Sequence, residues 1–195
     1  MTAERELAAA KRLIATYPLA WLVSRRFSAS PLPLLAECDE QGAIVALFGH
    51  CARSNPLCAD FAEDAGGLVL FNGPAGYISP RLVSEPDWAP TWNYAVLRFT
   101  VEIEFVPDET RGAVERLLSH LEGDGAERWS TGALGSRYER LLERIVGFRA
   151  HVRSFAPTFK LGQDEREDLF QEITTGHSNA ALVEWMRSFV ERIEQ

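Results

Sequence analysis

Residues 71–94 carry the side chains best suited to holding a flat polar ligand. Tyr77 and Ser79 lie two positions apart, so on an extended segment both hydroxyls point to the same side. Glycine and proline interrupt the apolar run before them, which predicts a sharp turn of the backbone. Such turns beside hydroxyls, an amide and an indole are typical of a small-molecule pocket, whereas a plain hairpin with an aromatic core is the simpler alternative. The candidate ligand-binding side chains here are Tyr77, Ser79, Thr91, Trp92 and Asn93.

A second candidate site is the octet Gly-His-Cys-Ala-Arg-Ser-Asn-Pro at residues 49–56. Asn55 is a favourable N-cap and Pro56 a favourable first helical residue, so a short helix is expected to begin there. The free N–H groups of a helix N-terminus attract anions, and His50 and Arg53 lie just before it. This combination predicts a monophosphate site, and a capped surface helix with a solvated arginine is the alternative.

The three cysteines are an odd number without CxxC spacing, which favours a reducing, cytoplasmic environment. Cys51 follows His50 and lies near Arg53, an arrangement that favours a thiolate, although many such cysteines are simply small buried apolar residues. The spacing of Cys38, His50, Cys51 and Cys58 matches no accepted metal site, so no metal is expected.

Charge and motifs exclude several other functions. The chain of 195 residues has a net charge of −8 and a pI of about 5.1, which argues against direct binding to DNA over a broad face. No apolar run is long enough to span a membrane, and residues 1–6 lack the pattern of a secretory signal. Nucleophilic-hydrolase, Walker and dinucleotide-binding motifs are not found.

The hydrophobic pattern predicts an α+β fold in which strands cluster in the middle of the chain. Amphipathic helices are expected at 3–16 and 179–193, with Asp108 capping another helix that ends near residue 121. No regular alternation of strand and helix occurs, so an antiparallel barrel or sheet with peripheral helices is expected. The predicted strands are 19–27, 32–37, 44–48, 67–71 with 76–79, 92–106 and 147–161.

Several sequence blocks, in order, resemble the PaiB-type FMN-binding negative transcriptional regulators of the FMN-binding split-barrel superfamily. They cover most of the chain. The blocks are Tyr-Pro-Leu-Ala at 17–20, Leu-Pro-Leu-Leu at 32–35, the octet at 49–56, Phe-Asn-Gly-Pro at 71–74, Tyr-Ile-Ser-Pro at 77–80, Pro-Thr-Trp-Asn-Tyr at 90–94, Ile-Val-Gly-Phe at 145–148 and Lys-Leu-Gly-Gln at 160–163.

The resemblance implies one antiparallel split β-barrel domain over residues 1–195, with the barrel at about 17–161 and a helical C-terminal appendage at about 164–195. It also implies a homodimer with one FMN at each end of its interface. His50, Arg53 and Asn55 would face the phosphate. By the same resemblance, Tyr77 and Ser79 would line the ribityl and ring region, with Thr91, Trp92 and Asn93 approaching from the same chain or its partner and Lys160 and Gln163 completing the pocket.

Two alternatives to a flavin-binding regulator stay open. One is an FMN-dependent oxidoreductase acting on a small molecule, in which the flavin carries the chemistry. The other is a dimeric scaffold whose FMN affinity is weak or lost. Four departures from the family pattern favour the second: Tyr17 and Pro31 replace histidines, residues 81–83 replace Ser-Trp-Tyr, and Gly162 with Asp164 replaces a serine and an asparagine.

Overall fold

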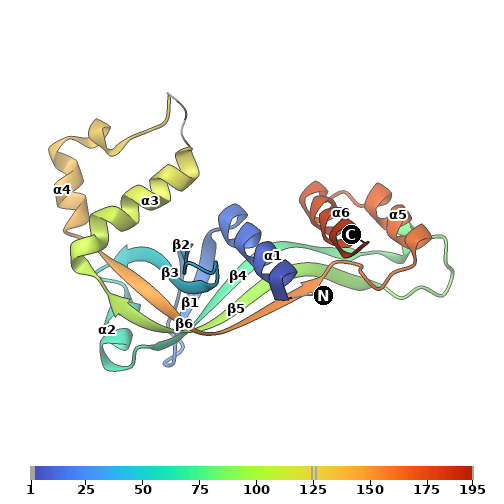
Figure 1. Cartoon of the computed structure of the whole chain (residues 1–195), viewed down its shortest axis with the longest axis horizontal. Coiled ribbons are helices and arrows are strands. Elements are labelled where there is room, and N and C mark those ends of the chain that lie inside the picture. Colours follow the sequence, from blue (N-terminus) through green and yellow to red (C-terminus); the bar gives the residue numbers. More distant parts are fainter. Residues whose placement is uncertain (1–2, 124, 126, 195) are drawn as a thin grey trace.

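Six antiparallel strands close into a barrel, and helices are attached to its outside (Figure 1). The computed structural model describes residues 3–123, 125 and 127–194, with side chains up to residue 190. The elements are α1 (Ala3–Thr16), β1 (Leu19–Ser24), β2 (Ala29–Cys38), β3 (Ile44–Ala52), α2 (Pro56–Glu63), β4 (Gly66–Ile78), η1 (Pro80–Leu82), β5 (Thr91–Phe105), η2 (Pro107–Glu109), α3 (Thr110–Glu122), η3 (Thr131–Leu134), α4 (Ser136–Leu142), β6 (Ile145–Lys160), α5 (Glu167–Gly176) and α6 (Ala180–Glu194).

The strand order around the barrel is β1-β2-β3-β6-β5-β4, and every neighbouring pair is antiparallel. Alternate side chains along each strand point inward, and the core is filled by fully buried rings and aliphatic chains such as Phe71, Phe99, Phe148 and Leu97. The Phe71 and Phe99 rings meet edge to face, with centroids 6.0 Å apart. The predicted fold class, an antiparallel split barrel with peripheral helices, is confirmed.

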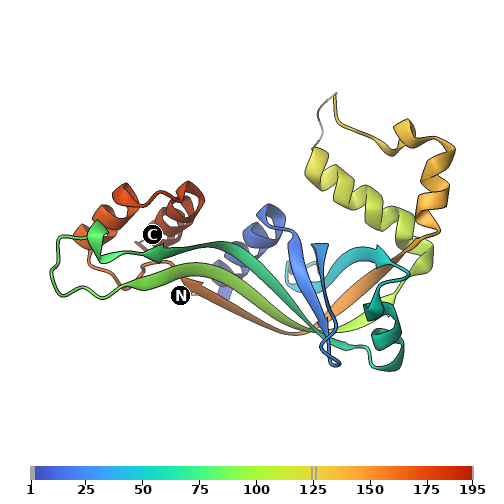
Figure 2. The same cartoon turned by 180° about the vertical axis from the view of Figure 1, so that it is seen from behind.

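Three strands run well past the barrel and form a projecting sheet, called here the extended sheet. It consists of residues 72–78 of β4, 91–96 of β5 and 157–160 of β6. Helices α1, α5 and α6 lie over one face of these strands, whereas no described helix covers the opposite face (Figures 1 and 2). A sheet with one uncovered face presents outward-pointing side chains along its whole length.

The glycines of β4 serve helix packing, which corrects the prediction of a sharp turn. The strand continues through this region with only an irregular register between Asn72 and Ala75. A Cβ at Gly73 would lie 2.9 Å from Leu13 of α1, and one at Gly76 would lie 2.8 Å from Leu182 of α6. Glycine therefore lets the covering helices approach the sheet closely.

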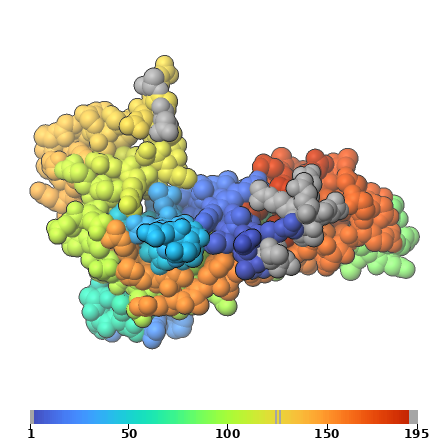
Figure 3. Space-filling model, in the orientation of Figure 1, coloured from blue at the N-terminus to red at the C-terminus, as the bar shows by residue number. Residues whose placement is uncertain are grey.

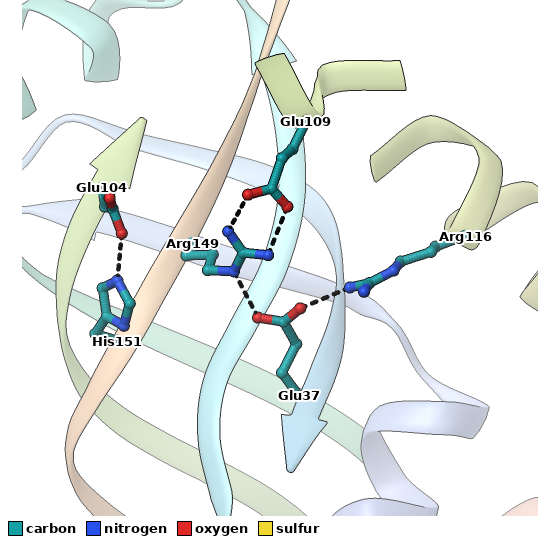
Figure 4. Close-up of polar contacts among 6 residues, drawn as sticks. All are labelled: Glu37, Glu104, Glu109, Arg116, Arg149 and His151. Atoms are coloured by element: carbon teal, nitrogen blue, oxygen red, sulfur yellow. Dashed lines mark hydrogen bonds and ion pairs between the residues drawn. The ribbon is translucent and has the colours of Figure 1, made fainter. Parts of the chain in front are cut away.

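A helical arm, made of α3, η3 and α4, projects from one end of the barrel, and α3 packs on β3 and β6 (Figure 3). Charged residues of four elements anchor its base (Figure 4). Arg149 of β6 donates from both terminal nitrogens to Glu109, at 2.6 Å each, and from Nε to Glu37 of β2 at 2.9 Å. Arg116 of α3 donates to the other Glu37 oxygen at 2.6 Å. Beside them, His151 and Glu104 form a more exposed pair at 2.7 Å.

Helix α3 begins at Thr110, with Glu109 as its N-cap, so the prediction that Asp108 caps this helix is wrong. Asp108 lies instead in the short 3-10 helix η2, which precedes α3. The predicted apolar stripe of α6 is confirmed, because Leu182 and Trp185 are buried against the rest of the molecule. Among the described residues, no helix is long and apolar enough to cross a membrane.

Candidate functional site

Tyr77 and Trp92 form an aromatic pair on the uncovered face of the extended sheet. They are register partners on β4 and β5, so their side chains leave the sheet on the same side. Their ring centroids lie 5.9 Å apart at an interplanar angle of 60°. Tyr77 is 48% exposed and Trp92 is 56% exposed. Large rings left this open provide an apolar wall against which a flat ring can pack.

A lysine and a threonine lie at the same end of the molecule. Lys160 is the register partner of Tyr94, the next outward-pointing residue of β5 after Trp92. Its ammonium group donates a hydrogen bond to the Thr91 hydroxyl. This pair lies at the same end of the extended sheet as Tyr77 and Trp92, although Thr91, two residues from Asn93, is on the opposite side of β5 from Trp92.

The other three predicted residues at this end already use their polar groups within the fold. Ser79 caps η1, accepting from the amide of Arg81 at 3.2 Å. Gln163 closes the turn after β6, accepting from the Leu161 amide at 2.7 Å and donating to the Phe159 carbonyl at 2.6 Å. The third residue is Asn93 on β5, whose side-chain amide faces the interior.

Asn93 is only 2% exposed and points to the helix-covered face of the extended sheet. Its Nδ2 lies 3.6 Å from the Met186 sulfur on α6. The residue thus lies on the opposite side of β5 from Trp92, as expected for adjacent positions of a strand.

His50, Arg53 and Asn55 lie at the other end of the barrel, where β3 leads into α2. Arg53 is exposed, and its Nε donates to the carbonyl of Glu143 at 3.1 Å. The Nδ1 atom of His50 is buried and has no hydrogen-bond partner among the described residues. Burial lowers the pKa of His50, so the neutral imidazole is favoured.

The N-terminus of α2 does not offer the free amides that the sequence predicts. Pro56 has no N–H, the Leu57 amide donates to Asn55 Oδ1 at 3.0 Å, and the Cys58 amide donates to the Asn55 carbonyl at 2.9 Å. The Asn55 amide nitrogen donates to Ser30 at 3.0 Å. The cap satisfies the helix end from within, so Arg53 and His50 remain as the groups suited to a phosphate.

The ten predicted residues fall into two groups at opposite ends of the long strands. Strand β6 passes both groups: Gly147 is the register partner of His50, and Lys160 lies at the aromatic end. This separation corresponds to about 40 Å along the strand, more than one FMN molecule can span. Three surface cavities described in the structure lie elsewhere: by α3 and Trp129, by Glu37 and Phe48, and by Asp60 and Arg25.

Two outward-pointing apolar residues of β1 were missed by the sequence analysis. Leu19 is 61% exposed and Trp21 is 45% exposed, while the alternate residues Ala20 and Leu22 are buried. Trp21 faces Leu70, which faces Arg98 on β5, so this apolar surface continues the uncovered face of the extended sheet. The available signal was a strand that is apolar at every position from Leu19 to Val23, which is typical of strands covered on both faces.

The groups present suit FMN in their chemistry, with an exposed guanidinium and an imidazole for phosphate and an aromatic wall for the ring. One chain cannot bring both sets to a single cofactor.

A family model described as "Putative FMN-binding domain" matches residues 1–154. Among curated proteins, the chain is 28% identical over 130 residues to the Protease synthase and sporulation protein PAI 2 of Bacillus subtilis (strain 168). That alignment covers 64% of this chain but only 61% of the relative's own length.

Solved structures with the same fold include a FAD and heme binding protein from Mycobacterium smegmatis, with a TM-score of 0.59 and 20% identity over 90% of this chain and 78% of that one. The flavocytochrome Anf3 from Azotobacter vinelandii matches with a TM-score of 0.54 and 12% identity, over 87% of this chain and 73% of that one. The conserved protein Rv2991 from Mycobacterium tuberculosis has the same TM-score, 0.54, with 9% identity over 86% and 90%. These likenesses show a shared barrel.

Proposed function

Because this chain belongs to the FMN-binding domain family, and FMN is the cofactor of that family, we propose that it is a homodimeric flavoprotein with a regulatory role. The observation that carries the proposal is the exposed Tyr77–Trp92 pair on a sheet face that no described helix covers. An isoalloxazine ring needs such a wall, and a dimer needs such a face.

The phosphate end of the cofactor is assigned to Arg53 and His50 of one subunit. A guanidinium binds phosphate through two parallel N–H donors, and Arg53 is exposed where β3 enters α2. The buried, unpartnered Nδ1 of His50 lies three residues away along the chain. Asn55 supports this loop by capping α2 and bonding to Ser30.

The ring end is assigned to Tyr77 and Trp92, with Lys160 and Thr91 at its edge. Bound FMN supplies one- and two-electron redox chemistry. The side chains of this subunit exclude water from one face of the ring and offer a cation to its polar edge. Ser79, Asn93 and Gln163 hold the strand ends that present these groups, through the hydrogen bonds they make within the fold.

A two-fold dimer is the arrangement that joins the two ends. In a two-fold interface, each patch meets the same patch of the other copy in the opposite sense. We place the uncovered faces of two chains against each other, with the aromatic end of one beside the Arg53 end of the other, twice per dimer. The apolar surface of Leu19 and Trp21 between them supplies the burial that stabilises such an interface.

The regulatory role rests on the similarity to PAI 2, and it acts through a protein partner or a sensed small molecule, in the cytoplasm. Direct binding to DNA is not proposed, because the net charge of the chain is −8. A net negative charge opposes binding to the phosphate backbone.

The test is the visible absorbance of protein purified without added cofactor, repeated after incubation with FMN and desalting, with molar mass measured by light scattering. A retained flavin spectrum with one FMN per chain, in a species of twice the chain mass, is expected. A colourless protein after FMN incubation would reject the cofactor assignment. Rapid reduction of bound FMN by NADH or NADPH would instead indicate an oxidoreductase.

A further inference from the structure

Two free cysteines meet beside the loop that carries Arg53. The Sγ atoms of Cys51, on β3, and Cys58, in the first turn of α2, lie 3.6 Å apart. This is contact distance for two sulfur atoms, and a disulfide would bring them to about 2.05 Å. A shift of about 1.5 Å, shared between two side chains, separates the thiols from a bond.

The two thiols differ in access. Cys51 is 4% exposed, whereas Cys58 is half-buried and its thiol lies 3.5 Å from the Ala52 carbonyl. Burial raises the pKa of the Cys51 thiol to about 12, with a further contribution from Cys58. The thiolate that the sequence favours at Cys51 is therefore not supported, and an oxidant from solution reaches Cys58 first.

The thiol pair closes a short loop. Residues 52–57 between the two cysteines include Arg53, whose amide donates to the carbonyl of Arg144 at 2.9 Å, and Asn55, which caps α2. Drawing the ends of this loop together shifts the strand end and the first helical turn toward each other. Because Arg53 lies within this loop, such a shift changes its position.

We propose that Cys51 and Cys58 are a redox-sensitive dithiol, which a peroxide converts into an intramolecular disulfide that closes the Arg53 loop. The thiolate of Cys58 attacks one oxygen of hydrogen peroxide. The O–O bond breaks, leaving a sulfenic acid and a hydroxide, which takes up the proton that the Cys58 thiol had released and becomes the first water. The Cys51 sulfur then attacks the Cys58 sulfur, the S–O bond breaks, and the departing hydroxide takes the Cys51 proton to form water. Two thiols are oxidised by two electrons and one peroxide is reduced to two waters.

The test uses the full chain with Cys38→Ser, which removes the exposed third cysteine on β2. The reduced protein is treated with hydrogen peroxide, blocked with N-ethylmaleimide under denaturing conditions and analysed by intact mass and peptide mapping. We expect loss of both maleimide-reactive thiols, a mass lower by two hydrogen atoms, a linked Cys51–Cys58 peptide, and full reversal by dithiothreitol. Adding Cys51→Ser is expected to leave a sulfenic acid on Cys58 that dimedone traps.

Intermolecular disulfides, or sulfinic acid on Cys58 without the internal link, would overturn the proposal. So would thiols that remain reactive in both cysteines after peroxide. The mass readout does not involve FMN, so failure here is separate from failure of the proposed function.

The effect on the cofactor rests on the proposed function. Flavin fluorescence titration of the Cys38→Ser protein is expected to show about tenfold weaker FMN binding in the disulfide form, the loss that follows from misplacing one charged contact. The matched Cys38→Ser, Cys58→Ser protein is expected to bind equally before and after peroxide. Equal affinity of both Cys38→Ser forms would overturn the link to the cofactor, and no binding in either form would reject the FMN site while leaving the dithiol result intact.

Discussion

Arg53 is the single residue whose removal tests the phosphate end most directly. Replacing it with alanine removes a charge-assisted contact worth about 1.5–3 kcal/mol, so FMN affinity is expected to fall by roughly tenfold or more. The fold is expected to stay intact, because the Arg53 side chain is exposed. Fluorescence titration of FMN measures the change, and Arg137→Ala, an exposed arginine on α4, is the control. Equal affinity of both variants would place the phosphate elsewhere.

His50 makes the stability of the protein pH-dependent. Its pKa is lowered by burial, so below its ordinary value of 6.5 the unfolded chain binds the proton more readily than the folded one. The stability that the neutral imidazole contributes is complete above that value and is lost as the pH falls. We expect the free energy of unfolding in urea to drop more steeply from about pH 7 to about pH 5 in wild type than in His50→Asn. Parallel curves would contradict a buried neutral imidazole.

At the residue scale, the sequence predicts local roles such as helix capping better than it predicts contacts with residues far along the chain. The motif spacing correctly places Asn55 as the cap of α2. It does not reveal that Ser30, from another strand, engages the same amide, or that Asn93 turns toward Met186. Those partners are set by strand register and helix docking, which local spacing does not encode.

At the scale of elements, the base of the helical arm depends on Arg149. Arg149→Met removes its hydrogen bonds to Glu37 and Glu109 while keeping an apolar stem over the Phe48 ring, 5.1 Å from the guanidinium carbon. We expect a loss of about 1–2 kcal/mol in the free energy of unfolding, together with faster amide exchange in α3.

The matched control is Arg153→Met on the same strand, whose ion pair with Glu102 is exposed. Exposed pairs contribute little, so its urea midpoint is expected to stay close to that of wild type. Equal losses in the two variants would mean that the arm is held by apolar packing alone.

Element prediction succeeded where periodicity is long and failed at the ends and breaks. The alternation through β5 and the stripe of α6 are strong enough to survive tertiary context. By contrast, Gly73 and Pro74 are read as a turn from local chemistry, yet β4 passes through them because α1 and α6 need the space above small residues. Local signals describe what the backbone tolerates, and packing decides how that tolerance is used.

At the scale of the whole molecule, the two groups of candidate residues lie about 40 Å apart along β6, so we expect that no single chain completes the proposed site. The sequence predicts the barrel and the two groups of residues but not their separation, which arises because β4, β5 and β6 are far longer than β1. The same length creates the uncovered face. Dimerisation and cofactor binding are therefore expected to be one property of this fold and to fail together.

A substitution at Trp21 tests whether FMN binding depends on dimerisation, because Trp21 is not one of the residues proposed to contact the ring. It lies on the uncovered face but on β1, away from the extended sheet that carries Tyr77 and Trp92. A charge buried at the centre of an interface costs about 2 kcal/mol or more, so Trp21→Glu is expected to give a monomer in light scattering at low micromolar concentration. FMN binding is expected to be lost with it, although Trp21 touches no part of the proposed ring site.

Trp129→Glu, on the exposed helical arm, is the matched control and is expected to remain dimeric and yellow. A Trp21→Glu monomer that still binds FMN would show that one chain suffices, and the site would then have to be rebuilt within a single barrel. A Trp21→Glu dimer would move the interface off this face. We expect Trp21→Glu to lose both dimerisation and FMN binding and Trp129→Glu to keep both, because the long strands β4, β5 and β6 hold the two groups of candidate residues too far apart for one chain to bind FMN.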